Sequence, residues 1–221
     1  MISFNELQEG VYDPNILKAF FLAGGPGSGK SYVVRQTTGG LGLKIVNSDK
    51  AFEKYLKDAN LSLKMPDEEK YARDPVRAKA KKITQNQKSN YVEGRLGLII
   101  DGTGKNYAKI SDEATRLKQL GYDVHMVFVN TSLDTALERN KRRSRSVPES
   151  LVIKSWKDVQ SNIGKFSQYF RQNFVVVDNN DTDEDVMTPV YKQIKSLALA
   201  KISNPLGKQW VANELSKKKR K

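Results

Sequence analysis

The residues with the clearest chemical meaning form one uninterrupted motif near the N-terminus. The motif fits G-x-x-x-x-G-K-[ST], the Walker A or P-loop pattern, and consists of Gly24, Gly25, Pro26, Gly27, Ser28, Gly29, Lys30 and Ser31. Its glycines let successive backbone N–H groups turn toward an anion, and a helix that starts near Lys30 adds the positive end of its dipole. We expect Lys30 to reach the β- and γ-phosphates of a nucleotide and Ser31 to ligate Mg²⁺ through its hydroxyl.

Two aspartates follow apolar runs and are candidates for acid–base and metal chemistry. Asp101 ends the run at residues 96–101 in a Walker-B-like position, which makes it a candidate Mg²⁺ ligand; the alternative is that it only caps the glycine-containing turn after it. Asp49 follows the run at residues 43–47, at the end of a strand where open α/β sheets bind ligands. We expect Asp49 to accept the proton of an attacking hydroxyl; the alternative is a cap for the helix that begins at Lys50.

The densest basic cluster in the body of the chain lies just before Val147. Its members are Arg139, Lys141, Arg142, Arg143 and Arg145. Five cations within seven residues repel one another unless an anion gathers them, so the cluster predicts a lid that supplies arginine to a transferring phosphoryl group. The alternative is a solvated helix end whose charges complement the helix dipole.

Apolar runs and helical stretches alternate along the chain, and this order predicts how the motifs come together. Strands are expected at residues 18–23, 43–47, 96–101, 123–129 and 174–178, and helices at 30–37, 50–59, 67–91, 107–120, 133–143 and 181–200. Most of the strand runs are continuous rather than alternating, which is typical of a parallel sheet covered on both faces. We therefore predict an α/β fold of the P-loop NTPase type: a mainly parallel sheet of about five strands, helices on both faces, and a lid helix segment.

Composition narrows the class of protein. The chain has 221 residues, no cysteine and one histidine, which excludes disulfide scaffolds, thiolate zinc sites and iron–sulfur clusters. The excess of 38 Lys and Arg over 25 Asp and Glu gives a formal net charge of +13 and suggests a polyanionic partner. Neither a run long enough to span a bilayer nor a secretory signal is evident, so we expect an intracellular, cytoplasmic protein with no membrane partner. The oligomeric state cannot be inferred.

Three other features have less specific meanings. His125 lies inside an apolar run and is expected to belong to the core. The aromatic-rich stretch at residues 156–170 is also expected to pack in the core, although it could stack on bases. The basic, weakly apolar segment at residues 64–88 fits either a helix that tracks a nucleic-acid backbone or a solvated helix.

The combination of motifs resembles two kinds of P-loop kinase. The P-loop, the step Asn47-Ser48-Asp49 with Phe52 after it, and the strand and turn at residues 98–104 are similar to the zeta-toxin type of kinase, over residues 20–177. The basic run at residues 139–143 is similar to the lid of phage polynucleotide 5′-kinases. The resemblance implies an enzyme that uses ATP and Mg²⁺ to phosphorylate a hydroxyl, which in zeta toxins belongs to a UDP-N-acetylated amino sugar.

The resemblance also implies roles for individual residues. Lys30 and Ser31 would contact the phosphates and Mg²⁺, Asp49 would be the base, Arg143 the lid arginine, and Arg139 a second lid residue. The alcohol group of the acceptor would attack the γ-phosphate.

The acceptor side of the site is less well defined. Asp101 matches the acid that zeta toxins carry before Gly-Thr, which contacts the substrate, so Asp101 and Thr103 are candidate substrate-binding residues while Asp101 also remains a candidate metal ligand. Lys50 departs from the family pattern, in which a second acid or a small residue follows the base. We assign residues 1–200 to a P-loop kinase domain and residues 201–221 to a flexible basic tail.

Three functions follow from these observations. The first is a kinase that transfers the γ-phosphate of ATP to a nucleic-acid hydroxyl, either a 5′-OH or a hydroxymethylated base. The second is a zeta-toxin-like kinase of a nucleotide sugar or another small metabolite. The third is a non-catalytic NTP-binding interaction or virion-associated module, in which the nucleotide only regulates assembly.

Overall fold

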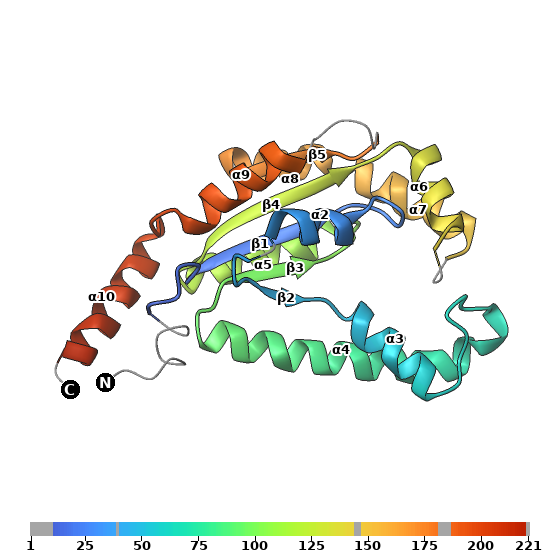
Figure 1. The fold of residues 1–221 in the computed structure, drawn as a ribbon, viewed down its shortest axis with the longest axis horizontal. Coiled ribbons are helices and arrows are strands. Elements are labelled where there is room, and N and C mark those ends of the chain that lie inside the picture. The colour runs from blue at the N-terminus through green and yellow to red at the C-terminus, as the bar shows by residue number, and fades with distance from the viewer. Residues whose placement is uncertain (1–10, 39, 144–146, 181–186, 220–221) are drawn as a thin grey trace.

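A five-stranded parallel sheet forms the centre of the computed structural model, which describes residues 11–38, 40–143, 147–180 and 187–219 (Figure 1). The strands are β1 (Lys18–Ala23), β2 (Lys44–Val46), β3 (Leu98–Asp101), β4 (Asp123–Asn130) and β5 (Phe174–Asp178), in the spatial order β2-β3-β1-β4-β5. All six residues of the central strand β1 are buried, and Phe21 pairs with Ile100 of β3 and Met126 of β4. The predicted fold class is confirmed.

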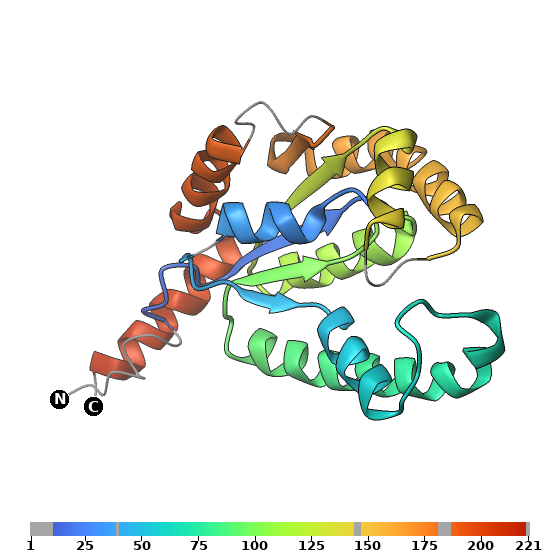
Figure 2. The same cartoon turned by 45° about the vertical axis from the view of Figure 1, so that its right-hand side comes forward.

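Helices cover both faces of this sheet (Figure 2). On one face lie α2 (Lys30–Thr38) and α9 (Met187–Leu199), over a core that includes Phe20, Leu22, Val33, Val127 and Ile194. On the other lie α5 (Tyr107–Gln119) and α8 (Ile163–Phe170), over a core that includes Phe21, Leu98, Leu117, Phe128 and Phe166. The apolar residues alternate between the two faces along β1, so one continuous apolar run serves both cores. The short η2 (Arg171–Asn173) then leads into β5.

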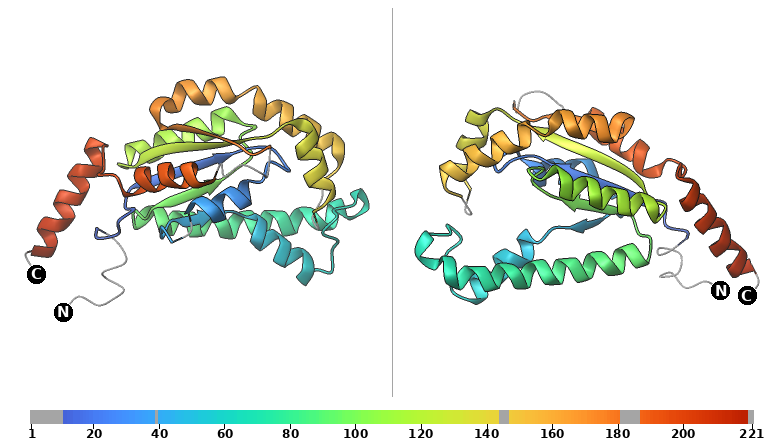
Figure 3. Two further views of the ribbon diagram at one scale, coloured as in Figure 1. Left: turned by 45° about the horizontal axis from the view of Figure 1, so that its top comes forward. Right: turned by 180° about the vertical axis from the view of Figure 1, so that it is seen from behind.

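A pair of helices extends beside the edge strand β2 (Figure 3). It comprises α3 (Asp49–Asp58), the 3₁₀ turn η1 (Asp67–Glu69) and α4 (Lys70–Glu93), and we call residues 49–93 the α3–α4 unit. Phe52 and Leu56, one helical turn apart, share a face of α3 and pack with Met65 and Ala80 in a core of their own. The α3–α4 unit therefore has internal packing that does not depend on the sheet.

The lid segment predicted from the basic cluster forms two helices, α6 (Leu133–Lys141) and α7 (Glu149–Gln160). Ser132 caps α6 by accepting a hydrogen bond from the Thr135 backbone N–H at 3.1 Å. The indole of Trp156 fixes α7 by donating a 2.8 Å hydrogen bond to the carbonyl oxygen of Thr131. In the right-hand view of Figure 3 these helices lie above the α3–α4 unit, at the same end of the molecule.

The opposite edge of the sheet, where the strands begin, carries a buried polar network. Lys18 and Asp123 form an ion pair of 2.7 Å with side chains only 2% and 6% exposed. Burial raises the pKa of Asp123, but hydrogen bonds from Lys18 and Ser203 outweigh burial and hold the pKa below its usual range. Asp123 Oδ1 also accepts a hydrogen bond of 2.9 Å from the Asn204 backbone N–H. The network thus anchors the segment that leads into the last helix.

That last helix, α10 (Pro205–Lys219), occupies much of the region that we expected to be a flexible tail. A Cβ on Gly207 would collide with the carbonyl oxygen of Gly121, so the two backbones approach closely where α10 crosses the turn before β4. The rest of α10 projects from the body (Figure 1). The division at residue 200 itself remains a prediction, and Arg220 and Lys221 lie outside the described residues.

His125 lies in the core, as predicted: it is 4% exposed and its ring stacks on Phe20 with centroids 4.9 Å apart. Across the described ranges, every helix is too short or too polar to span a membrane.

Candidate active site

The P-loop joins the central strand β1 to α2, at the edge of the sheet where the strands end. Gly24, Gly27 and Gly29 adopt φ values of +152°, +80° and +83°, the region that side chains rarely occupy. A Cβ on Gly24 would lie 2.7 Å from Ser28 Oγ, one on Gly27 would collide with the Ala136 carbonyl oxygen, and one on Gly29 with the Asn179 amide. The glycines therefore permit both the backbone turn and the close packing of its neighbours.

Lys30 lies inside this loop rather than in solvent. Its Nζ donates hydrogen bonds of 2.6 Å to the carbonyl oxygen of Gly24 and 3.2 Å to that of Gly25. Burial lowers the pKa of the Lys30 ammonium, Asp101 and Asp49 act in the opposite direction, and the positive charge of Arg143 lowers it further. The predicted base, the second carboxylate and the predicted lid arginine are thus all close enough to Lys30 to act on its charge.

Asn47 connects the carboxylate of Asp101 to the backbone of Asp49. Its side-chain Nδ2 donates a 2.6 Å hydrogen bond to Asp101 Oδ2, and its Oδ1 accepts a 2.7 Å bond from the Asp49 backbone N–H. Burial raises the pKa of Asp101; the nearby Lys30 charge opposes this and the Asp49 charge adds to it. Asp49 is the first residue of α3, with Ser48 in the N-cap position, so its side chain projects from the start of that helix.

Arg139 does not point toward the carboxylates. Its guanidinium donates a 2.7 Å hydrogen bond to the carbonyl oxygen of Asn179 and a 3.4 Å bond to that of Asn180, both in the segment after β5. The Asn179 side chain in turn donates a 2.8 Å bond to the carbonyl oxygen of Ser28 in the P-loop. Through Asn179, Arg139 therefore joins α6 to the end of β5 and the P-loop.

Two other members of the basic cluster form ion pairs, and a third acts on the P-loop lysine through its charge. Arg142 is paired with Glu138 at 2.5 Å and Lys141 with Glu149 at 3.7 Å, whereas the electrostatic effect of Arg143 falls on Lys30. Arg145 lies outside the described residues. Arg143 is thus the described cation of the cluster with an electrostatic link to the P-loop lysine.

Thr103 contacts the P-loop through its backbone. Its carbonyl oxygen accepts a 3.0 Å hydrogen bond from the Gly24 N–H, which ties the turn after β3 to the P-loop, while its side chain is exposed. The outer side of the P-loop meets the lid: a Cβ on Gly25 would lie 3.7 Å from the Cα of Trp156 in α7.

Sequence reasoning missed the contacts that Asn47 and Asn179 make around the P-loop and Asp101. Asn47 stands inside a motif that was recognised, but only the spatial neighbourhood of Asp101, 54 residues away, reveals its partner. Asn179 and Asn180 directly follow the last strand, and a polar pair at the carboxyl end of a parallel strand is a signal that could have indicated the site.

The residues at the P-loop fit a nucleotide and a magnesium ion. Ser28 Oγ is buried and has no hydrogen-bond partner among the described residues, in a loop whose glycines leave room for an anion. The hydroxyl of Ser31 is exposed at the start of α2, and Asp101 ends the adjacent strand β3. The described ranges contain no group of three or more acidic, histidine or cysteine residues that could hold a metal ion. At this site Mg²⁺ would take some of its ligands from the phosphates of the nucleotide.

The fold resembles that of several solved structures at low sequence identity. A putative kinase from Chloroflexus aurantiacus superposes with a TM-score of 0.57 at 14% identity, covering 81% of this chain and 97% of that one. The AvrRxo1-ORF1:AvrRxo1-ORF2 structure with sulphate ions gives 0.61 at 15% identity, covering 83% and 65%. The Pnkp1/Rnl/Hen1 RNA repair complex gives 0.53 at 20% identity, covering 69% and 47%. This chain therefore spans only part of the latter two proteins.

Comparison with curated protein sequences finds no match. The zeta toxin family model, in contrast, matches residues 12–188, which include the P-loop, Asp49, Asp101 and Arg143. The match extends over all five strands of the sheet. The chain therefore belongs to the zeta toxin family and is a P-loop phosphotransferase.

Proposed function

We propose that the protein is an ATP- and Mg²⁺-dependent kinase that transfers the γ-phosphate to a hydroxyl on a nucleic acid, either a 5′-OH or a hydroxymethylated base. The observation that supports the chemistry is that the charges of Asp101, Asp49 and Arg143 all act on the Lys30 ammonium. Phosphoryl transfer needs a base that positions the attacking hydroxyl and positive charge around the transferring group. This cluster contains both.

In the proposed reaction, Asp49 accepts the proton of the acceptor hydroxyl as the hydroxyl oxygen forms its bond to the γ-phosphorus. The bond between that phosphorus and the β,γ-bridging oxygen breaks, and ADP leaves with the oxygen. Lys30 and Arg143 stabilise the charge on the transferring group, while Asp101 orients the acceptor or the metal. Mg²⁺ bound between the Ser31 hydroxyl and the phosphates would supply further charge neutralisation.

The helices next to Asp49 support a polyanionic acceptor. Between Pro75 and Val92, α4 carries no carboxylate and five cations: Arg77, Lys79, Lys81, Lys82 and Lys88. Two of them lie on aromatic rings of α3, because the Arg77 guanidinium is 4.4 Å from the ring centroid of Phe52 and Lys79 Nζ is 4.6 Å from that of Tyr55. This places cations directly on the helix whose first residue is Asp49, where a phosphate backbone could follow them to the base.

The direct test is label transfer from γ-labelled ATP with Mg²⁺ to parallel acceptors: 5′-OH oligonucleotides, DNA with hydroxymethylated pyrimidines, and nucleotide sugars. We expect label in a nucleic acid, abolished by Asp49→Asn and retained by Asp58→Asn, a matched change at the exposed far end of α3. Label in the nucleotide sugar alone would replace the nucleic-acid proposal with the second function. Label in none of the acceptors, with nucleotide binding intact, would favour the interaction module. That function would gain further support if Lys30→Ala abolished nucleotide binding without changing the effect of expressing the protein in cells.

Salt dependence tests the nucleic-acid part separately. The end of α10 is basic, with Lys217 and Lys218 exposed, and we propose that it contributes phosphate contacts. Deletion of residues 217–221 is then expected to weaken oligonucleotide binding and to flatten its dependence on salt, by a slope of about 0.7 for each single-strand phosphate contact that is lost. Unchanged affinity and slope would remove α10 from the binding surface.

A further inference from the structure

One buried asparagine joins the two lid helices. The side chain of Asn140, in the last turn of α6, donates a 2.8 Å hydrogen bond from Nδ2 to the carbonyl oxygen of Val147 and accepts a 3.1 Å bond at Oδ1 from the Val147 N–H. Asn140 is 5% exposed. Its amide therefore satisfies both backbone hydrogen-bonding groups of Val147. This pair of bonds fixes the end of α6 against Val147, which precedes Pro148 and α7.

Arg143 is attached to the same residue. Its backbone N–H donates a 3.4 Å hydrogen bond to the carbonyl oxygen of Asn140, so the main chain of Asn140 holds Arg143 while the side chain holds Val147. The charge of Arg143 acts on Lys30 in the P-loop. Residues 144–146, between Arg143 and Val147, lie outside the described ranges and are not needed for these contacts.

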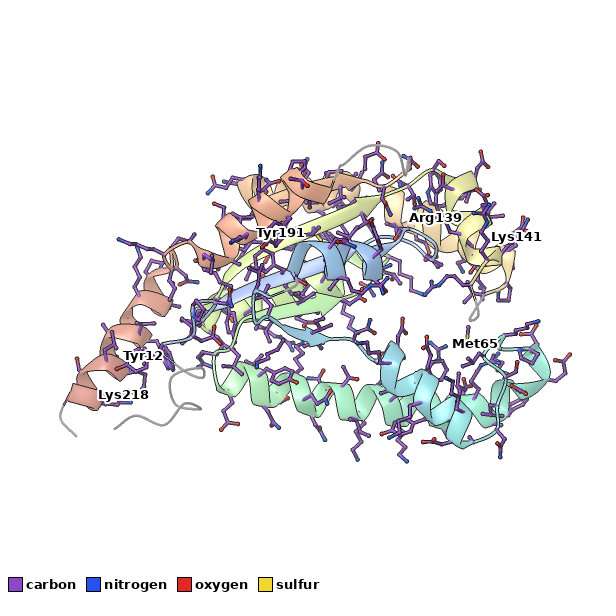
Figure 4. The ribbon with its side chains drawn as sticks, in the orientation of Figure 1. Tyr12, Met65, Arg139, Lys141, Tyr191 and Lys218 are labelled. Atoms are coloured by element: carbon purple, nitrogen blue, oxygen red, sulfur yellow. The ribbon has the colours of Figure 1, made fainter. Side chains whose placement is uncertain are left out.

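Val147 extends the connection across the site. It packs against the core of the α3–α4 unit, the cluster that includes Phe52, Leu56 and Met65. Figure 4 shows Met65 facing the end of α6 that carries Lys141. The two hydrogen bonds of Asn140 thus connect the segment that carries Arg143 to the helix pair that carries Asp49.

We propose that Asn140 is a positioning residue for phosphoryl transfer, which holds Arg143 at the phosphate site and sets the distance between the lid and the α3–α4 unit. The proposal rests on the proposed function, in which Arg143 stabilises the charge of the transferring group. Such stabilisation requires donors that are fixed before the reaction, and a misplacement of about 1 Å can cost roughly 10²-fold in rate. Asn140 fixes this arginine without touching the reacting atoms.

The test separates the transition state from the ground state. ADP with aluminium fluoride mimics the charge distribution of the transferring group, so its affinity is compared with that for ATP by calorimetry for wild type and for Asn140→Ala. We expect the variant to bind ADP–aluminium fluoride at least tenfold more weakly, with the dissociation constant for ATP within about twofold of wild type. Equal weakening of both ligands would overturn the proposal, because it would show a general structural role.

A double-mutant cycle identifies the group through which Asn140 acts. Arg143→Ala is expected to lose affinity for ADP–aluminium fluoride, and adding Asn140→Ala to it is expected to cause no further loss. Losses that multiply would show that Asn140 does not act through Arg143. If Arg143→Ala does not change the affinity for ADP–aluminium fluoride, the proposed role of Arg143 fails. If Arg143→Ala weakens this affinity and Asn140→Ala does not, only the role of Asn140 is overturned.

Two further variants control for folding. Asn204→Ala removes a comparable side chain, which donates bonds of 2.8 and 3.1 Å to the carbonyl oxygens of Lys118 and Tyr122 at the opposite edge of the sheet, and it should lower thermal stability without changing the ratio of the two affinities. Asn140→Asp keeps the shape but loses the donor to Val147 until its carboxyl is protonated. At pH 7.5, with this donor lost, its affinity ratio is expected to change in the same direction as that of Asn140→Ala; a wild-type ratio would contradict the proposal.

Discussion

Asn47 donates a 2.6 Å hydrogen bond to the carboxylate of Asp101, across the ends of the neighbouring strands β2 and β3. The bond stabilises the charged form of a carboxyl whose pKa is raised chiefly by burial. Asn47 therefore orients the Asp101 carboxylate, while its Oδ1 holds the backbone of Asp49.

Asn47→Ala is expected to lower the rate of phosphoryl transfer by about 10- to 100-fold with little change in ATP affinity. Removing the hydrogen bond favours the neutral carboxyl and raises the pKa of Asp101 further, so the acidic limb of the pH–rate profile should move to higher pH. Label transfer measured from pH 5 to pH 8 tests this. The control is Asn86→Ala, on the exposed surface of α4. A lower rate with an unshifted acidic limb would show that Asp101 ionisation does not limit the reaction.

Gly29→Ala is expected to abolish nucleotide binding. Gly29 has φ +83° and an added Cβ would collide with the Asn179 amide, so the substitution adds a steric clash to backbone strain of about 1–2 kcal/mol. Gly40→Ala is the matched control, since Gly40 has φ +76° but its Cβ would meet nothing within 4 Å. Binding of a fluorescent ATP analogue and thermal melting compare the two. Equal effects would mean that strain alone, rather than the contact with Asn179, makes glycine necessary.

Asp123→Asn is expected to destabilise the fold by about 3–5 kcal/mol, because it leaves the Lys18 ammonium buried without its ionic partner. The folded-state pKa of Asp123 is depressed, so its contribution to stability is present above the unfolded pKa and is lost as pH falls through the folded one. Urea unfolding at pH 7 and at decreasing pH measures both effects. The difference between wild type and variant should shrink on acidification; a constant difference would exclude linkage through this group.

His125→Phe is expected to protect the fold against acid. Burial lowers the pKa of His125 to about 4, and neither ring nitrogen has a hydrogen-bond partner among the described residues. The unfolded chain therefore binds a proton near pH 6.5 that the folded chain excludes, so stability is complete above that pH and falls as pH drops toward 4. Between pH 7 and pH 5 the loss is about 2 kcal/mol. Chemical unfolding at both pH values should show a smaller loss for the variant, and an equal loss would place the titration elsewhere.

Local patterns in the sequence predicted the parts of the fold that short segments determine. The strands at residues 18–23 and 174–178 match β1 and β5 to the residue: the glycines of the P-loop follow the first run, and Asn173 and Asn179 flank the second. Gly121 directly follows the helix expected at residues 107–120 and adopts φ +98°, a conformation that glycine favours at the end of a helix. The helix expected at residues 181–200 is described as Met187–Leu199, and its first part lies outside the described residues.

Contacts between distant segments could not be predicted in the same way. The start of α10 is held by Asp123, about 80 residues earlier, and a pattern rich in lysine at residues 217–221 indicates only a solvated end. The pairing of Asn140 with Val147 depends on two helices that turn back on each other. Arg139 and Arg143 would share a face if α6 continued to residue 143, but α6 ends at Lys141, so Arg139 contacts Asn179 from the helix whereas Arg143 lies beyond its end.

The contact between Tyr12 and Lys218 has a consequence for the connectivity of the molecule. The ammonium of Lys218 lies 4.7 Å from the ring centroid of Tyr12, so two residues separated by nearly the whole chain meet beside α10 (Figure 4). A short peptide between these two positions could bridge the distance and turn residues 12–218 into a closed ring. New termini could then be opened at Gly40, which is exposed and has no atom within 4 Å of the position of an added Cβ. The fold is therefore suited to circular permutation, which would change the order of the strands in the sequence and keep their order in the sheet.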